Sequence, residues 1–299
     1  MKFGKVDDPS QVDFTIPSTP QETIDVLSRH TTDDPFEVSV GCAKWNRKDL
    51  KGFYPRGTKD ELAYYSRQFN AIELNATFYN SPSKNQVEIW KNKTPEGFKF
   101  FPKIPQSISH YSRLLNTDEK VREFVDATVL FEDRLGMGFL QLIDNFKPKD
   151  FDRLESFLEK FPKGYPLAVE VRNKEWFSAG TADRFYELLE RTEKTNILVD
   201  TAGRRDMMHM RLTTPTAFIR FVGANHPSDY TRLEQWVDRI AEWKQSGLQQ
   251  LNFFIHQNVE VESPLLATHF IKKLNKTIGT SLALPDTGSA KDDGQSSLF

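Results

Sequence analysis

The sequence predicts an α/β protein that folds as a single (β/α)8 TIM barrel, and three observations lead to this prediction. Eight short apolar runs alternate along the chain with stretches whose apolar residues recur at helical spacing. Such alternation is typical of parallel sheets whose strands are connected by helices. The length of 299 residues suits one barrel domain. A doubly wound open sheet would give a similar alternation, but residues 40–44 (VGCAK) contain one glycine and no glycine-rich phosphate loop.

The eight apolar runs are the expected strands. Each is short, rich in β-branched or aromatic residues, and bounded by polar or turn-forming residues. We expect strands at residues 37–42, 70–75, 98–103, 138–142, 166–171, 196–200, 217–221 and 251–256.

Helices are predicted between these strands from capping residues and apolar periodicity. The segment from Thr58 to Glu61 has the spacing of a capping box, and the segment from Ser83 to Gln86 repeats that spacing. Residues 203–212 are a poor helix candidate. One helix is expected to end before Gly247. It has the clearest apolar face of the chain, formed by Leu233, Trp236, Val237, Ile240 and Trp243.

The barrel is expected to cover residues 37–280, with a segment on either side. Residues 1–36 contain four prolines and a short helical stretch near 20–29, and we expect this extension to pack on the barrel. Residues 281–299 are expected to form a flexible tail, because most of this segment has the composition of a linker.

Composition excludes several function classes. The net charge of −2 gives no overall basic field that would recruit nucleic acid, although a local basic cleft is compatible with it. A single cysteine, Cys42, excludes an intramolecular disulfide and a cysteine-cluster metal site. No apolar run approaches the roughly 18 residues of a membrane span, and the first residues lack the apolar region of a signal peptide. We therefore expect a cytoplasmic protein without membrane partners.

Polar side chains follow the predicted strands at their C-terminal ends. Glu73 and Asn75 lie two apart and therefore point to the same face of a strand, and Glu170 and Arg172 repeat this spacing. Ionisable groups in buried strands are costly unless they are paired or used. Since the functional groups of a barrel gather at this end, we expect one polar pocket there. Its candidate residues are Lys44, Trp45, Glu73, Asn75, Tyr79, Lys103, His110, Glu170, Arg172, Trp176, Arg220 and Asn258.

The motifs around these residues carry a family resemblance. Residues 40–45 (VGCAKW), 73–79 (ELNATFY), 170–172 (EVR) and 220–221 (RF) occur in this order. Together they resemble the YecE-like family, known as domain of unknown function 72, whose signature E-x-N-x-T-F-Y is matched over 73–79. The resemblance spans roughly residues 37–276. It implies a TIM-barrel fold and does not supply an enzyme class.

The cations of the predicted pocket favour a small anionic or phosphorylated ligand. Lys103, Arg172 and Arg220 would hold a phosphate or carboxylate, because arginine binds such groups bidentately. A phosphorylated sugar, a nucleotide or a nucleic-acid end fits this inventory. The catalytic roles, if the protein is an enzyme, would fall to Glu73 or Glu170 as general base and His110 as its acid–base partner. The stacking walls for a ring would be Trp45, Tyr79 and Trp176.

A divalent metal is the alternative use of the same carboxylates. Its ligands would be Glu73, Glu170, Asp200 and either His110 or His256. The sequence has no closely spaced histidine pair, and the neighbouring lysine and arginines would repel a cation. We therefore expect salt-bridged carboxylates and no metal or other cofactor, with a metal-dependent isomerase or endonuclease-like enzyme as the alternative.

Residues 295–299 (QSSLF) resemble the pentapeptide that binds the bacterial sliding clamp, commonly Q-L-S-L-F. Gln295 would make the polar contact, and Leu298 and Phe299 would enter an apolar pocket. The resemblance implies a setting in DNA replication or repair, and a clamp-associated binding protein without catalysis is a second hypothesis for function. A chance match is the alternative.

Overall fold

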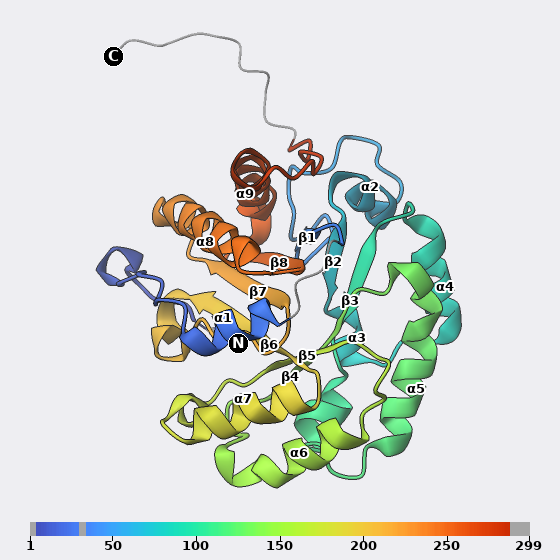
Figure 1. Ribbon diagram of the computed structural model, residues 1–299. Coiled ribbons are helices and arrows are strands. Elements are labelled where there is room, and N and C mark those ends of the chain that lie inside the picture. The colour runs from blue at the N-terminus through green and yellow to red at the C-terminus, as the bar shows by residue number, and fades with distance from the viewer. Residues whose placement is uncertain (1–3, 30–33, 288–299) are drawn as a thin grey trace.

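The computed structural model describes residues 4–29 and 34–287 and has an α/β fold with parallel strands (Figure 1). Six strands form one sheet in the order β1-β8-β7-β6-β5-β4, and β2 pairs with β3 in a second sheet. The strands are β1 (Glu37–Cys42), β2 (Ala71–Leu74), β3 (Lys99–Pro102), β4 (Gly138–Gln141), β5 (Leu167–Glu170), β6 (Thr195–Thr201), β7 (Thr216–Gly223) and β8 (Gln250–Gln257).

The helices alternate with the strands along the chain. In the described part, no helix is both long enough and apolar enough to cross a membrane. The α-helices are α1 (Gln21–Ser28), α2 (Glu61–Gln68), α3 (Ala76–Tyr79), α4 (Lys84–Lys93), α5 (Asp118–Thr128), α6 (Phe151–Lys160), α7 (Thr181–Arg191), α8 (Ser228–Gln245) and α9 (Ser263–Ile278). Shorter helical turns are η1 (Pro9–Gln11), η2 (Ser107–Tyr111), η3 (Val129–Arg134), η4 (Pro148–Asp150), η5 (Lys174–Phe177), η6 (Ala202–Met207) and η7 (Glu260–Glu262).

Each of the eight predicted strands is confirmed, with ends that differ from the prediction by at most two residues. The apolar face predicted for residues 233–243 is also confirmed, because all five of its side chains are buried in α8. Ser83 caps α4, as predicted, by accepting a hydrogen bond from the backbone N–H of Gln86. The first capping box is wrong, since Asp60 and not Thr58 accepts the N–H of Ala63 at the start of α2.

The two sheets meet without a regular ladder between β1 and β2. In their place, side chains join the strands. The amide of Asn70 accepts from Val40 N (2.8 Å) and donates to Val38 O (2.6 Å). The hydroxyl of Tyr65 lies between Cys42 N (2.7 Å) and Ala71 O (3.1 Å). The arrangement is thus TIM-like in strand order but open at this seam, and a fully closed barrel is not confirmed.

An aromatic layer fills the space between the two sheets. Phe101 of β3 contacts Phe254 of β8, with ring centroids 4.8 Å apart, and Phe218 of β7 at 5.8 Å. Phe139 of β4 packs on Phe218 at the same distance of 5.8 Å. All four rings are fully buried. This layer supports the charged side chains that lie above it at the C-terminal ends of the strands.

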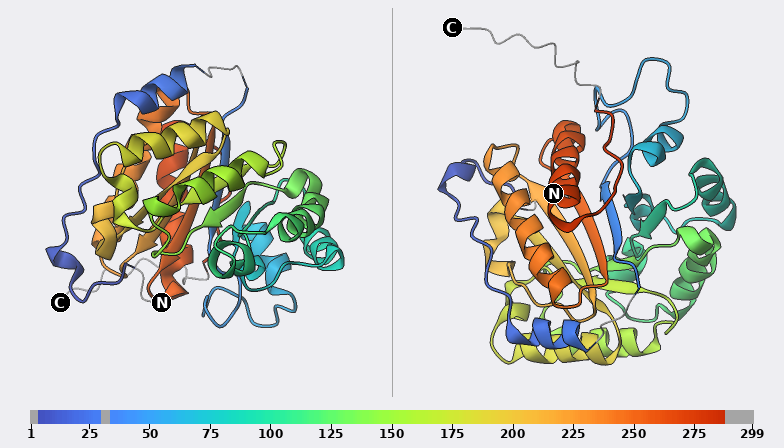
Figure 2. Two further views of the ribbon diagram at one scale, coloured as in Figure 1. Left: turned by 90° about the horizontal axis from the view of Figure 1, so that it is seen from below. Right: turned by 45° about the horizontal axis from the view of Figure 1, so that its top comes forward.

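The N-terminal segment packs against the α/β body, as expected for an extension. Helix α1 lies beside α7 in both orientations of Figure 2. Thr23 donates to the carbonyl oxygen of Met210 (2.9 Å), and Trp243 of α8 donates through Nε1 to Thr19 (2.9 Å). Further along, the carbonyl oxygen of Gly4 accepts the N–H of Gly203 (2.8 Å). These contacts bring the start of the described chain to the C-terminal end of β6.

Candidate functional site

A polar pocket of about 500 Å³ lies at the C-terminal ends of the strands. Side chains from several strands and from the loops after them form its wall, as the sequence predicts for this end of the sheet. The predicted residues in this wall are Lys44, Asn75, Tyr79, Lys103, Arg172, Arg220 and Asn258.

Arg220 of β7 is the centre of the charged cluster. Its guanidinium donates to both carboxylate oxygens of Glu73, through Nε (2.9 Å) and Nη2 (2.8 Å). Its Nη1 donates to Oε2 of Glu170 (2.5 Å). Glu73 is 0% exposed and Glu170 is 1% exposed. Arg220 therefore joins β2 to β5 across the interior and neutralises carboxylates that would otherwise be buried without a countercharge.

A chain of hydrogen bonds runs from Glu170 to Lys103. Arg172 donates through Nε to Oε1 of Glu170 (2.6 Å), and the amide of Gln141 donates to both oxygens of that carboxylate (3.0 and 3.1 Å). These two bonds orient the Gln141 amide, so its Oε1 faces away from Glu170 and accepts from Nζ of Lys103 (2.8 Å). The four side chains lie at the ends of three neighbouring strands, β3, β4 and β5, and form one connected network.

The two buried carboxylates are held in their charged form. Burial alone would raise their pKa values, but Arg220 and His256 bring the pKa of Glu73 well below its usual range. Arg172 and Arg220 likewise overcome the effect of burial and lower the pKa of Glu170 to about 2. A carboxylate with such a low pKa is a poor proton acceptor near neutral pH. The geometry therefore favours a positioning role over the general-base role expected for Glu73 and Glu170.

Lys103 has the opposite electrostatic environment. It is 7% exposed, and its Nζ lies 4.1 Å from the ring centroid of Phe78. Burial, together with the positive charges of Arg220 and Arg172, lowers the pKa of Lys103 to about 7. Lys103 is thus a pocket-lining side chain whose charge changes near neutral pH.

Two histidines flank the cluster. His256 of β8 lines the pocket, and its Nε2 lies 2.9 Å from Oε2 of Glu73. His110 lies in η2 and contacts the edge of Phe78, with ring centroids 4.9 Å apart. Burial and the charge of Lys103 lower the pKa of His110 to about 4, so its imidazole is neutral at pH 7. His110 is not part of the pocket wall, because Phe78 lies in that wall beside it.

The two predicted tryptophans do not line the pocket, and this expectation is corrected. Trp176 is 0% exposed, and its Nε1 donates to the carbonyl oxygen of Phe146 (2.8 Å), so the indole belongs to the core around α6 and α7. Trp45 is partly buried and packs edge-on against Trp90 of α4. Tyr79 is the predicted aromatic residue that does lie in the pocket wall, and it is 66% exposed.

Several wall residues were not among the candidates. Phe78 lies inside the motif that contains Tyr79, beyond the end of the strand expected at residues 70–75. Residues 76–79 form the one-turn helix α3, which turns both aromatic rings to the pocket. Lys5 arrives from the N-terminal extension and has no local sequence signal. Gln141 and His256 lie at the ends of predicted strands, and His256 was considered only as a ligand of the alternative metal site.

The carboxylates proposed as metal ligands do not share one site. Glu73 and Glu170 pair with Arg220, whereas Asp200 has other partners. Asp200 accepts from Arg232 Nη2 (2.7 Å) and from Trp236 Nε1 (2.8 Å), and Arg205 forms a further ion pair with it. Within residues 4–29 and 34–287, no group of three or more potential ligands of the His, Cys, Asp and Glu types is placed to hold a metal ion. Asp200 thus fixes helix α8 to β6.

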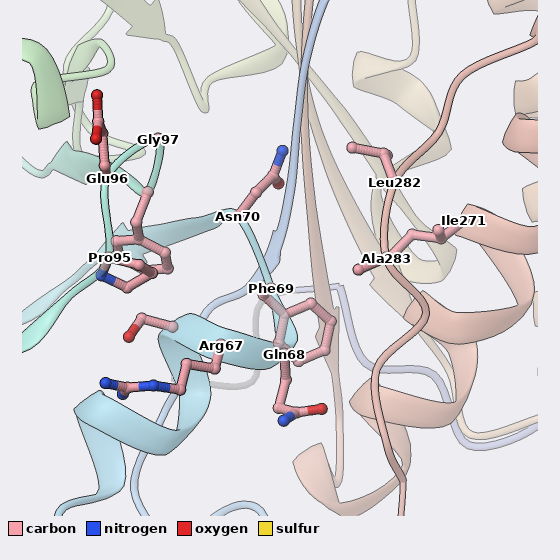
Figure 3. A pocket seen from close by; sticks show the side chains of 12 residues that line it. Arg67, Gln68, Phe69, Asn70, Pro95, Glu96, Gly97, Ile271, Leu282 and Ala283 are labelled. Carbon is pink, nitrogen blue, oxygen red and sulfur yellow. The ribbon is translucent and has the colours of Figure 1, made fainter.

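A second pocket, of about 440 Å³, lies at the opposite ends of the strands (Figure 3). Phe69 and Asn70 at the start of β2, Pro95 before β3, and Leu282 after α9 line it. The amide of Asn70 is already bonded to the backbone of β1. We therefore place the candidate site at the polar pocket and not here. Gln295, Leu298 and Phe299 of the predicted clamp-binding tail lie outside the described residues.

Comparisons with known proteins agree with the sequence resemblance. The family model described as "Protein of unknown function DUF72" matches residues 39–289. The UPF0759 protein YecE of Escherichia coli (strain K12) is 30% identical over 288 residues, which cover 88% of this chain and 100% of that protein. The UPF0759 protein YunF of Bacillus subtilis (strain 168) is 30% identical over 150 residues, covering 47% of this chain and 52% of that protein.

Solved structures with the same architecture carry the same family description. A DUF72 family protein from Thermotoga maritima MSB8 is 27% identical, with a TM-score of 0.65 over 80% of this chain and 99% of that chain. A DUF72 family protein from Enterococcus faecalis V583 has a TM-score of 0.66 over 83% of this chain and 98% of that chain, and at 17% identity it supports the fold alone. The family model and the Escherichia coli relative both span most of this sequence. The chain therefore belongs to the DUF72 family of YecE-like proteins.

Proposed function

We propose that the strand-end pocket binds a small ligand through a phosphate or carboxylate group. One observation carries this proposal: five basic side chains and no carboxylate lie in the described pocket wall. The basic residues are Lys5, Lys44, Lys103, Arg172 and Arg220.

The buried carboxylates match two of these five positive charges. Glu73 and Glu170 lie beneath the pocket wall, where their charges are matched by Arg220 and Arg172. Lys103 makes no ion pair with a carboxylate of the described chain, and Lys44 forms one partly exposed ion pair, with Asp49 at 3.7 Å. A concave pocket lined by positive charge attracts anions more strongly than a flat surface patch of the same charge.

The size and remaining wall of the pocket favour a sugar- or nucleotide-sized ligand. Its volume of about 500 Å³ lies in the usual range for small-molecule sites. Phe78 and Tyr79 provide aromatic surface, and Asn75 and Asn258 provide amide groups for hydroxyls or ring nitrogens. A phosphorylated sugar, a nucleotide or a nucleic-acid end would use all three kinds of contact.

The test is the affinity of the Arg172→Ala variant for phosphorylated ligands. Ribose 5-phosphate, glucose 6-phosphate and adenosine monophosphate serve as probes, with calorimetry as the measurement. A hydrogen bond to a charged group contributes about 1.5–3 kcal/mol, so the best probe should bind the variant at least about tenfold more weakly. Glu170 keeps Arg220 and Gln141 as partners, so the fold should survive, which circular dichroism checks.

The matched control is Arg191→Ala. Arg191 lies on the outer face of α7, is half exposed, and pairs with Glu155 and Glu159 away from the pocket. Its removal should leave the affinity unchanged. Unchanged affinity in the Arg172→Ala variant as well would overturn the proposed anion site.

A further inference from the structure

Lys103 is held in one position by its backbone as well as by its side chain. Its N–H donates to the carbonyl oxygen of Leu74 (3.3 Å), and its own carbonyl oxygen accepts the hydroxyl of Thr77 (2.7 Å). The side chain then passes into the pocket, where Nζ donates to Gln141 and lies over the ring of Phe78. A reactive group that is fixed in this way has little freedom to lose when a substrate binds.

The surroundings of Nζ suit an uncharged amine. Lys103 is buried, and no carboxylate of the described residues forms an ion pair with its ammonium form. The guanidinium groups of Arg172 and Arg220 further disfavour a third positive charge in the network, and with burial they bring the pKa of Lys103 to about 7. At pH 7 about half of this amine is then neutral, against about one molecule in 2,500 for a lysine with the ordinary pKa of about 10.4.

From this placement we propose that Nζ of Lys103 forms an imine with an aldehyde or ketone group of a phosphorylated ligand. A neutral lysine amine in a desolvated site beside other cations is a carbonyl nucleophile. The inference rests on the proposed function, because the anion contacts deliver the carbonyl group to Lys103. Arg172 and Lys44 would hold the phosphate toward the rim, and the carbonyl carbon would lie deeper, over Phe78.

The chemical step is balanced without a cofactor or an oxidant. The nitrogen lone pair adds to the carbonyl carbon, the C=O π bond breaks, and one proton moves from nitrogen to oxygen to give a carbinolamine. The C–O bond then breaks, one proton is taken up from solvent, and water leaves. The product is a protonated imine on Lys103, which can withdraw electrons from the neighbouring carbon of the ligand.

Reductive trapping on the intact chain tests this inference. Dihydroxyacetone phosphate is added with cyanoborohydride, which reduces the imine to a stable secondary amine, and peptide mapping by mass spectrometry locates the adduct. We expect the adduct at Lys103 to exceed that at Lys99, at the start of β3, by at least about tenfold at pH 7, because the amine of Lys103 is far more often neutral. Its rate of formation should rise with pH and level off above about pH 7.

Variants and an unphosphorylated probe provide the controls. The Lys103→Met variant should lose the adduct, and Lys99→Met should keep it, since Nζ of Lys99 bonds to Asp133 O at the opposite end of β3. Dihydroxyacetone without phosphate should label Lys103 more slowly. The wild-type peptide map does not depend on the folding of any variant.

The outcomes separate the two proposals. Binding of dihydroxyacetone phosphate by calorimetry without an adduct at Lys103 would overturn the imine and leave the anion site intact. An adduct level at Lys103 no higher than at Lys99 would also overturn it. Absence of both binding and adduct for this probe would overturn the imine together with the phosphate contact on which it rests.

Discussion

Replacing Arg220 with Met should destabilise the fold more than any exposed arginine replacement. Arg220 is 5% exposed and binds Glu73 and Glu170 at once. Removing one partner of a buried ion pair costs about 3–5 kcal/mol, because the other charge stays buried without compensation. Glu170 retains Arg172, whereas Glu73 loses its main countercharge. We therefore expect the free energy of unfolding to fall by about 4 kcal/mol, within that range.

Urea denaturation followed by tryptophan fluorescence measures this change. The control Arg191→Met should lose less than about 1 kcal/mol, because surface ion pairs contribute little. In a double variant, Glu73→Gln with Arg220→Met, no charge remains unpaired at position 73, so it should be clearly more stable than Arg220→Met alone. A loss below about 1 kcal/mol for Arg220→Met, or a double variant no more stable than the single one, would refute this reasoning.

The loss should also depend on pH, with a defined sign. In the wild-type protein the pKa of Glu73 lies below its unfolded value, so its stabilising contribution is complete above that value and falls as the pH falls. Without Arg220, burial should raise the pKa of Glu73. The buried charge of Glu73 then destabilises the fold less as the pH falls, because the carboxyl becomes protonated. The difference between wild type and Arg220→Met should therefore be smaller at pH 5 than at pH 8.

Two further predictions concern the seam and the tail. Gly41→Ala should destabilise the protein by about 1–3 kcal/mol or more, as overpacking does, because a Cβ atom there would lie 2.1 Å from the carbonyl oxygen of Ala71. Thermal unfolding measures this change. Gly164→Ala is the neutral control, because a Cβ atom at position 164 meets nothing within 4 Å. Deletion of residues 295–299 should remove binding to a purified bacterial sliding clamp in surface plasmon resonance, and failure of the intact chain to bind would exclude the clamp hypothesis.

The sequence predicted the fold well where local patterns are sufficient. The eight strands and the apolar face of α8 follow from periodicity, which depends on neighbouring residues alone. The open seam between β1 and β2 could not be predicted in this way. It depends on Asn70 and Tyr65, whose side chains replace backbone bonds to residues 30 and 23 positions away in the sequence.

The candidate site was predicted in part. Charged residues at strand ends were found because strand ends converge in space, and Glu73, Glu170 and Arg220 do meet. The burial of Trp176 could not be read from its neighbours, since a short turn, η5, sends its ring to the core. The low pKa values of Glu73 and Glu170 and the lowered pKa of Lys103 could be found only from the structure, because they depend on which cation pairs with which anion.

The placement of a phosphate ion tests the central claim most directly. The intact protein would be crystallised and soaked in inorganic phosphate, and separately in ribose 5-phosphate, and the electron density of the strand-end pocket would be examined. We predict a phosphate group against the guanidinium of Arg172 in both crystals, with the sugar beside Tyr79 in the second. Phosphate bound elsewhere on the protein, with none in this pocket in either crystal, would contradict the account.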